Sequence, residues 1–454
     1  MNHLLTRRQM LARAGSGFGL LALADLFARA EEPRIMLPHH APRAKRCIFL
    51  FMPGGPSQID MFDPKPRVLA ENGQPLPFEK PKLERTKTGA LFGSPWKFSK
   101  YGQCGADVSE LLPHLAQRVD DLCIIRSMVA DNINHSGAAL QMNTGEQAFS
   151  RPSLGSWVNY GLGTENQNLP SFVVIAPEPP FQGAPLWSAS FLPASHQGTW
   201  VRDAANPIAD LTPAGELARQ RTKLDFLRTL NAAHKQGRVN ESALDARVAS
   251  FELAFRMQSA APEAFDLSRE TDAMKTMYGL DEKPTATFGR SCLLARRLVE
   301  RGVRFVQAYD TGTGGWDHHG GIRAALPARC AGIDKPIAAL LGDLKARGLL
   351  EDTLVVWGGE FGRTPTTEGG DGREHHPFGF TMFMAGGGVK GGITHGETDE
   401  FGWHAVKDKV HVHDLHATIL HLMGLDHERL TFRYGGRDYR LTDVFGHVVK
   451  EVLA

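Results

Sequence analysis

The stretch from Arg46 to Gly55 reads RCIFLFMPGG, a short apolar run that stops at a proline and two glycines. An uninterrupted apolar run of this length is typical of a strand that is buried on both faces, and the glycines predict a tight loop. Similar runs recur along the chain and predict further strands of the same sheet. They are LCIIR at 122–126, SFVVIA at 171–176, VRFVQA at 303–308, TLVVW at 353–357 and TMFMA at 381–385.

Helical patterns lie between these runs, among them 290–301 and 322–347. Buried strands that alternate with helices predict an α/β fold, a three-layer α/β/α sandwich with a mostly parallel central sheet. Two segments interrupt the alternation: an irregular excursion at about 64–105, and a cap-like insertion of charged, amphipathic helices at about 178–288. We expect one large domain over residues 31–454.

Residues 1–30 have the three parts of an export signal. A charged start that includes Arg7 and Arg8 precedes an apolar run at 14–27 and an A-x-A cleavage site at 28–30. Paired arginines are typical of twin-arginine signals, which direct folded proteins out of the cytoplasm. The apolar run is shorter than the roughly 20 residues that a transmembrane helix needs. We therefore expect a periplasmic or secreted mature protein with no transmembrane span; the alternative is an uncleaved anchor at the membrane surface.

The chain has 454 residues, of which 51 are Lys or Arg and 50 are Asp or Glu, so its formal net charge is +1. Four of the basic residues and one of the acidic residues lie in the predicted signal, which leaves the mature chain at −2. This balance excludes the basic surface that nucleic-acid binding requires. Histidine is unusually frequent: there are 19, and nine of them lie between His375 and His427.

Polar residues follow the predicted strands, where a parallel sheet binds its ligands. The carboxyl ends of parallel strands meet at one edge of the sheet, so the loops that leave them should converge. An aspartate and two histidines in succession, as at 317–319, can meet one divalent ion, since Zn²⁺ accepts imidazole nitrogen and carboxylate oxygen. The candidates are Asp60, His135 with Ser136, Asp317, His318 and His319, Glu360 with Arg363, and His375 with His376.

Each of these loops also has a structural explanation. Gly54 and Gly55 can form a simple turn with Asp60 as a capping residue, and Asn134 can cap an ordinary helix that begins at His135. The functional use of that same helix start is anion binding, because its free N–H groups and dipole favour negative charge. The helix that carries the later histidines has a clear apolar face, so most of these are interpreted as structural: His411, His413, His416 and His421.

Six longer strings carry a family resemblance: GGPSQIDMFDPKP, HSGAALQMNTGE, GGWDHHGG, WGGEFGRTP, GREHHPFGF and DLHATILHLMGLDHERLTFRYGGRDYRLTDV. Together they resemble the secreted bacterial family DUF1501, within the alkaline phosphatase/sulfatase superfamily, and the resemblance covers nearly the whole mature chain. It implies an alkaline-phosphatase-like fold that holds one or two divalent metal ions, often zinc, at the carboxyl edge of its sheet. It also implies attack on a phosphate or sulfate ester by a nucleophile at the start of a helix.

The resemblance places His135 at the position of the nucleophile. In sulfatases a helix that begins with Cys or Ser reaches a Thr-Gly pair ten residues on, and Thr144-Gly145 follow His135 at that spacing. Histidine departs from this pattern. It excludes formylglycine chemistry at this position, but it can act as a nucleophile toward phosphorus or as a metal ligand. Ser136 lies beside it and is the alternative nucleophile.

The resemblance also implies one metal ion, expected to be zinc, held by Asp317, His319 and His375. An ion with three protein ligands and one open position is the catalytic rather than the structural pattern. Arg363 would neutralise the negative charge of the substrate. The remaining candidates would orient these groups or complete a weaker second metal site: Asp60, Glu360, His318 and His376.

Two departures argue against a second metal ion. Phe361 stands where the superfamily has a metal-binding histidine, and Pro53 stands where an acidic residue is usual. The predicted function is an exported, metal-dependent hydrolase of a phosphate or sulfate ester on a small molecule or glycan. The departures motivate an alternative, a degenerate member that binds a glycan or a protein partner without turnover.

Overall fold

The computed structural model describes residues 37–79, 83, 89–202, 216–235 and 242–454. The chain divides into two units, Met1–Leu37 and Pro38–Ala454, and all the helices and strands described belong to the second. The predicted export signal at 1–30 lies outside the described residues. Among the described helices, none combines the length and the apolar character that crossing a bilayer requires.

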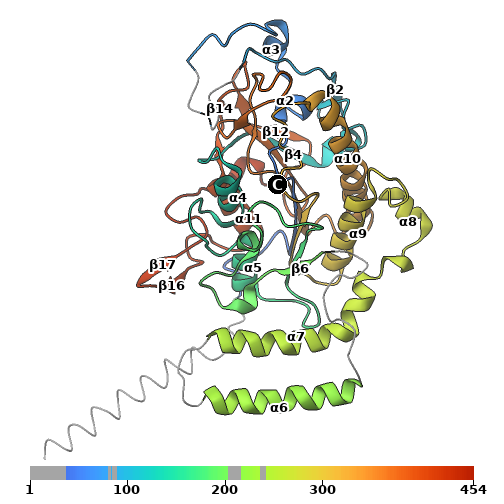
Figure 1. Cartoon of the computed structure of the whole chain (residues 1–454), viewed down its shortest axis with the longest axis vertical. Coiled ribbons are helices and arrows are strands. Elements are labelled where there is room, and N and C mark those ends of the chain that lie inside the picture. The colour runs from blue at the N-terminus through green and yellow to red at the C-terminus, as the bar shows by residue number, and fades with distance from the viewer. Residues whose placement is uncertain (1–36, 80–82, 84–88, 203–215, 236–241) are drawn as a thin grey trace, which may run out of the picture. The chain divides into compact units, whose positions relative to one another are not determined.

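A nine-stranded sheet forms the centre of the second unit (Figure 1). Among its described strands, only one, β11, runs antiparallel to its neighbours, so the prediction of a mostly parallel sheet is confirmed. The strand order is β12 (Ile393–His395), β4 (Leu122–Val129), β11 (Phe380–Ala385), β8 (Thr353–Gly358), β1 (Arg46–Phe51), β7 (Phe305–Tyr309), β5 (Phe172–Ile175) and β6 (Thr199–Val201), and β15 (Val410–His411) pairs with β4.

The strand β1 lies near the middle of this sheet. Its residues pair in parallel with β7 on one side, as Cys47 does with Phe305, and with β8 on the other, as Cys47 does with Leu354. From Cys47 to Phe51 every side chain is buried. A strand with a neighbour on each edge and a helical layer on each face has no exposed side, which explains its unbroken apolar sequence.

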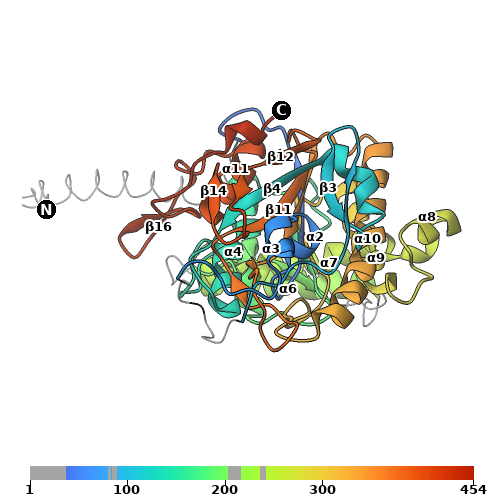
Figure 2. The same cartoon turned by 90° about the horizontal axis from the view of Figure 1, so that it is seen from above.

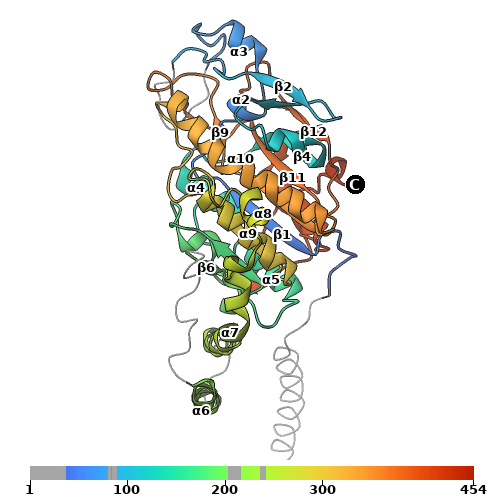
Figure 3. The same cartoon turned by 90° about the vertical axis from the view of Figure 1, so that its right-hand side faces the viewer.

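Helices cover both faces of the sheet and complete the three predicted layers. On one face α9 (Ala286–Glu300) and α10 (Ile322–Ala346) pack against each other, and α9 also contacts β7. The other face carries α4 (His135–Thr144), α5 (Leu154–Leu162) and α11 (Val412–Leu422), as Figures 1 and 2 show. In Figure 3 the α9–α10 layer lies in front of the sheet.

Short elements decorate the ends of the sheet. The excursion predicted at 64–105 is not wholly irregular, because it contains one short helix and the first strand of a hairpin. Within this excursion lie α3 (Pro66–Ala70) and β2 (Phe98–Tyr101). The short elements of the whole unit are α2 (Gln58–Met61), α3 and the hairpins β2–β3 (Phe98–Tyr101, Ala106–Ser109), β9–β10 (Gly362–Arg363, His375–His376), β13–β14 (Glu397–Thr398, Ala405–Lys407) and β16–β17 (Phe432–Tyr434, Arg437–Tyr439).

The insertion at 178–288 holds α6 (Leu217–Lys235), α7 (Ser242–Phe265) and α8 (Asp272–Met277). Arg256 of α7 donates to the carbonyl of Gln167, which precedes β5, and Arg297 donates to Ala264 near the end of α7. Both contacts lie on segments that lead into the amino ends of β5 and β7. The candidate ligands follow the carboxyl ends of the strands, so α7 does not lie over them.

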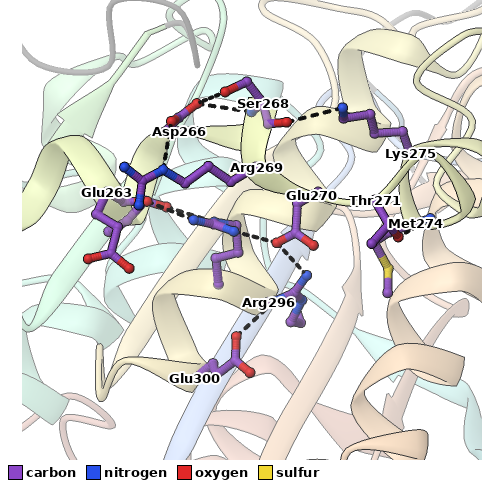
Figure 4. Close-up of polar contacts among 12 residues, drawn as sticks. Glu263, Asp266, Ser268, Arg269, Glu270, Thr271, Met274, Lys275, Arg296 and Glu300 are labelled. Carbon is purple, nitrogen blue, oxygen red and sulfur yellow. Dashed lines mark hydrogen bonds and ion pairs between the residues drawn. The ribbon is translucent and has the colours of Figure 1, made fainter.

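A buried ion network joins the segment after α7 to α9 (Figure 4). Arg296 is almost fully buried and donates to Glu270 and to Glu300, both at 2.8 Å. On the same segment, Thr271 caps α8 by accepting from the amide of Met274. Because a buried charge without its partner costs several kcal/mol, these pairs fix the position of the segment on the core.

Candidate metal centre

Four side chains converge at the carboxyl edge of the sheet. The Oδ1 atom of Asp317 lies 3.1 Å from Nε2 of His135, 2.8 Å from Nε2 of His319 and 3.3 Å from Nε2 of His375. The four candidate ligand atoms all lie within 4.8 Å of one another, so the group could hold a metal ion. Three of its members are the predicted ligands, and the fourth, His135, is the predicted nucleophile.

Separate elements bring these residues together. His135 is the first residue of α4, whose cap Asn134 accepts a hydrogen bond from the amide of Ser136 at 3.0 Å. Asp317 and His319 lie on the glycine-rich loop between β7 and α10, and His375 begins β10. In the antiparallel β9–β10 pair, His375 stands opposite Arg363.

The loop after β1 needs glycine in order to fit against this centre. Gly54 has φ +114°, a backbone conformation that other residues rarely adopt. A Cβ atom at this position would lie 2.7 Å from the backbone nitrogens of Trp316 and Asp317. The glycine predicted to form a turn therefore also allows the Asp317 loop to approach β1.

Each of the three imidazoles is held through its second nitrogen. Nδ1 of His135 lies 2.5 Å from Oε1 of Glu360, and Nδ1 of His319 contacts the carboxylate of Glu368. Nδ1 of His375 lies 2.7 Å from the carbonyl oxygen of Ile133. An acceptor at Nδ1 keeps the proton there and turns the lone pair of Nε2 toward the centre, which is the usual arrangement of metal-binding histidines.

One nitrogen of the centre lacks a hydrogen-bond partner among the described residues, and a metal ion would supply the missing interaction. Nε2 of His135 is buried and makes no hydrogen bond to any described residue, although Asp317 lies close by. A buried polar atom without a partner is costly, and a cation on this lone pair would remove the cost. The chemistry of the donor set agrees, since imidazole nitrogen and carboxylate oxygen are ligands that zinc accepts.

The charges of the centre favour a bound cation. Burial opposes ionisation of Asp317, but the three imidazoles close to its Oδ1 atom and the charge of Arg363 hold its pKa well below the usual range. Burial also opposes a charge on His135, but the carboxylates of Asp317 and Glu360 raise its pKa to about 9. Positive charge is therefore stabilised at this point, whether protons or a metal ion supply it.

Arg363 does not take the role predicted for it. Its side chain is fully buried, and its guanidinium donates to the carbonyl oxygens of Gly54, Gly55 and Arg373 as well as to Oδ1 of Asp317 at 2.7 Å. A side chain committed to three backbone carbonyls and one carboxylate is not presented to a substrate. Arg363 instead positions Asp317 and links it to the loop after β1.

Two further predicted residues lie outside the centre. Asp60 is fully buried and pairs with Arg373 through both carboxylate oxygens, at 2.8 and 2.9 Å, so it completes no second metal site. His376 is buried against the rings of Phe378 and Trp403. Successive side chains of a strand point to opposite faces, so His376 points away when His375 points inward.

His318 is buried outside the four-residue group, and burial lowers its pKa to about 4. Glu360 contacts His135 but is not one of the grouped ligands. Phe361 packs its ring 4.9 Å from that of His135 and 4.7 Å from that of His375. An aromatic ring thus lies beside the centre, and Phe361 offers no metal ligand there.

Sequence reasoning missed Glu368 and Phe181, which both touch the centre. Glu368 contacts His319 directly, and Glu374 forms with both of them a second group of possible ligands. Phe181 stacks on the imidazole of His135 at 4.7 Å and 12°. Glu374 stands next to His375 in the sequence, but nothing in their own sequence context sets Glu368 or Phe181 apart from surface residues.

The two carboxylates that hold imidazoles should control metal affinity. Glu360→Gln and Glu368→Gln each keep a similar shape but lose the charge on the acceptor, so we expect each to weaken metal binding by about 10- to 100-fold. Competition with a fluorescent chelator measures the affinity, and Glu428→Gln, an exposed site, is the matched control. Unchanged affinity in both variants would contradict the role assigned to these side chains.

The buried His376 should make the fold sensitive to acid. Burial lowers its pKa to about 4, from 6.5 in the unfolded chain, so its stabilising effect is complete above pH 6.5 and is lost as the pH falls toward 4. At about 1.4 kcal/mol per pKa unit, this one residue lowers the free energy of unfolding by roughly 3 kcal/mol across that range.

In His376→Phe we expect the fall in unfolding free energy between pH 7 and pH 4 to be smaller by roughly that amount. Urea titrations of the chelator-treated chain at both pH values measure it. His447→Gln, at an exposed position, should behave like the wild type. An identical acid dependence in His376→Phe would show that His376 is not the responsible group.

A model of the family described as "Protein of unknown function (DUF1501)" matches residues 44–453. No curated protein matches the chain. Several solved structures are similar in fold at low identity. They include an alkaline phosphatase from the Antarctic bacterium TAB5 (10% identity, TM-score 0.35, 84% of this chain and 98% of that one), the PsFucS1 sulfatase from Pseudoalteromonas sp. (13%, 0.35, 85% and 69%) and the lipoteichoic acid synthase LtaP from Listeria monocytogenes (9%, 0.38, 89% and 76%).

Proposed function

The chain belongs to the DUF1501 family, and from this premise we propose that it is an exported, metal-dependent hydrolase of a phosphate or sulfate ester. One observation carries the proposal: three Nε2 atoms and one carboxylate oxygen face a common point, while an acceptor holds every Nδ1 atom. A set of histidines oriented in this way is built to bind a metal ion. The proposed substrate is an ester of a small molecule or a glycan.

The proposed ligands are His135, Asp317, His319 and His375, with zinc as the expected ion. When bound, such an ion polarises an ester oxygen and lowers the pKa of a water molecule toward about 7. Hydrolysis also requires access for water and substrate. The side chains of Asp317 and His319 are 23% and 16% exposed, so solvent reaches the group on their side.

The other residues of the centre have supporting roles in this proposal. Glu360 and Glu368 orient the rings of His135 and His319, and Arg363 fixes Asp317. With His135 directed at the ion, Ser136 is the remaining nucleophile candidate at the start of α4. The positive end of the helix dipole would favour an anionic ester there.

A second candidate function is binding of a glycan or a protein partner without turnover. Two features support it: Phe361 occupies the place of a second-metal ligand, and the charge of Arg363 is used inside the protein. The two candidates share the metal ion and differ in catalysis.

The test of the proposal is the metal content of the purified mature chain, followed by a screen of aryl and sugar phosphates and sulfates. We expect about one equivalent of zinc in the wild type and loss of both metal and hydrolysis in His375→Ala. His447→Ala is the matched control. A metal-free wild type, or unchanged metal content in His375→Ala, would refute the metal centre, and a bound metal with no turnover would favour the second candidate.

Export by the twin-arginine route is part of the proposal and rests on residues 1–30. Replacing Arg7 and Arg8 together by lysine should retain the chain in the cytoplasm, because the signal type is defined by the paired arginines. Cell fractionation measures the distribution. Normal export of the double-lysine variant would show that another route is used.

A further inference from the structure

A cavity of about 290 Å³ lies beside the carboxyl ends of β5 and β6, apart from the metal centre. Its lining combines apolar side chains with two arginines and two hydroxyl groups. Among the described residues that line it there is no carboxylate. The lining includes Ile175, Pro177, Arg202, Thr287, Arg290 and Ser291.

Both arginines are exposed to solvent, so their guanidinium groups are accessible to a ligand. Neither Arg202 nor Arg290 forms an ion pair with any described residue. The guanidinium of Arg202 lies 4.2 Å over the ring of Trp200, whose indole nitrogen donates to the carbonyl of Ala176 at 2.9 Å. This arginine is thus held at the cavity by stacking, which leaves its N–H groups for another partner.

The start of α9 adds to the positive potential of the cavity. Thr287, Arg290 and Ser291 belong to the first two turns of this 15-residue helix. The positive end of a helix dipole attracts anions, and guanidinium and hydroxyl groups are donors to phosphate or sulfate oxygens. These groups have the chemistry that a tetrahedral oxyanion requires of its donors.

The cavity lies within reach of the metal centre. Pro177 lines the cavity and Phe181, four residues later, stacks on His135. Four residues of extended chain span at most about 14 Å. Between them Glu178 packs near Gly312, on the loop that leads to Asp317. One extended ligand could therefore touch both places.

We propose that this cavity binds a phosphate or sulfate group of the same substrate whose ester bond is cleaved at the metal centre. The inference rests on the proposed function and narrows the substrate class to esters that carry at least two such groups, as a multiply sulfated or phosphorylated glycan does. A free inorganic anion shares this chemistry, so the test separates the two sources.

The first measurement is calorimetric titration of the chelator-treated mature chain with inorganic sulfate and inorganic phosphate. We expect the double variant Arg202→Ala/Arg290→Ala to bind the anion at least about tenfold more weakly, since two charge-assisted contacts are lost. The double lysine variant, which keeps the charges, should recover part of the affinity. Arg433→Ala, an exposed arginine on β16, is the control. Equal binding by wild type and double alanine variant would overturn the proposal.

The second measurement uses the metal-loaded enzyme and compares kcat/KM for a sugar monosulfate and the corresponding disulfate, and likewise for phosphates. In the double alanine variant the preference for the doubly charged ester should fall about tenfold. If the double alanine variant binds the inorganic anion more weakly but keeps the wild-type preference for the doubly charged ester, the substrate assignment is overturned. If no ester is cleaved while anion binding still depends on the two arginines, the proposed function fails and the oxyanion site stands.

Discussion

Replacing Asp317 by asparagine should lower the affinity for divalent metal by more than about 100-fold and reduce ester hydrolysis at least as much. Mutating a residue that only hydrogen-bonds to a metal ligand lowers metal affinity by up to about 100-fold. Asp317 is itself a candidate ligand, so its loss should lower the affinity further. Its Oδ1 atom is the common neighbour of three imidazole nitrogens and of the Arg363 guanidinium. Without this charge, a bound metal ion would lose a carboxylate ligand, and the buried cation of Arg363 would lose its hydrogen-bonded carboxylate partner.

Chelator competition measures the metal affinity, and the ester screen measures the activity. Asp371→Asn is the matched control: this carboxylate accepts from the amide of Gly321 at the other end of the same loop region. The Asp371→Asn variant removes the same negative charge as Asp317→Asn, and Asp371 lies outside the group of candidate ligands. Wild-type affinity in Asp317→Asn would show that the metal ion, if one binds, is held elsewhere.

Arg363→Ala should destabilise the fold by about 3–5 kcal/mol, the usual cost of removing one partner of a buried charge pair. The variant leaves the carbonyl oxygens of Gly54, Gly55 and Arg373 without their donor and the carboxylate of Asp317 without its closest cation. Each buried acceptor that loses its partner adds to the cost. Urea denaturation of the metal-free chain measures the effect without a contribution from metal binding.

Arg363→Lys should recover only part of this loss. Lysine keeps the positive charge near Asp317 but lacks the fork that reaches several carbonyls at once. Arg67→Ala, at a more exposed ion pair on α3, should change the stability by less than about 1 kcal/mol. A loss below about 1 kcal/mol in Arg363→Ala would contradict the structural role of this arginine.

The sheet and the meeting of the loops could be predicted from sequence for a simple physical reason. Strands buried on both faces have unbroken apolar sequences, so the runs RCIFLF and TLVVW predict buried central strands. Parallel strands all end at the same edge, which brings Asp317 near His375 without any knowledge of distances. The side chains grouped at this edge are therefore visible from residue type and from the strand that precedes them.

The direction and partners of single side chains could not be predicted in the same way. Arg363 and His375 face each other only because β9 pairs with β10. The register of this pair is set by the tertiary structure and cannot be seen in the sequence. The same pair of short strands decides that His375 and not His376 points inward. Asp60 looks like a candidate ligand until its bidentate partner Arg373 is known, and that residue lies 313 positions later in the chain.

The centre is assembled from segments that are far apart in the chain, since His135 and its partner Glu360 are separated by 225 residues. The four candidate ligands are spread over residues 135–375, so the centre is complete only when the strands that position them have come together. If the chain leaves the cytoplasm already folded, the centre is assembled there, and the ion can be loaded before export from cytoplasmic stocks. The compartment in which the enzyme works and the one in which it is loaded would then be different, and the cytoplasmic availability of competing ions would decide which one it carries.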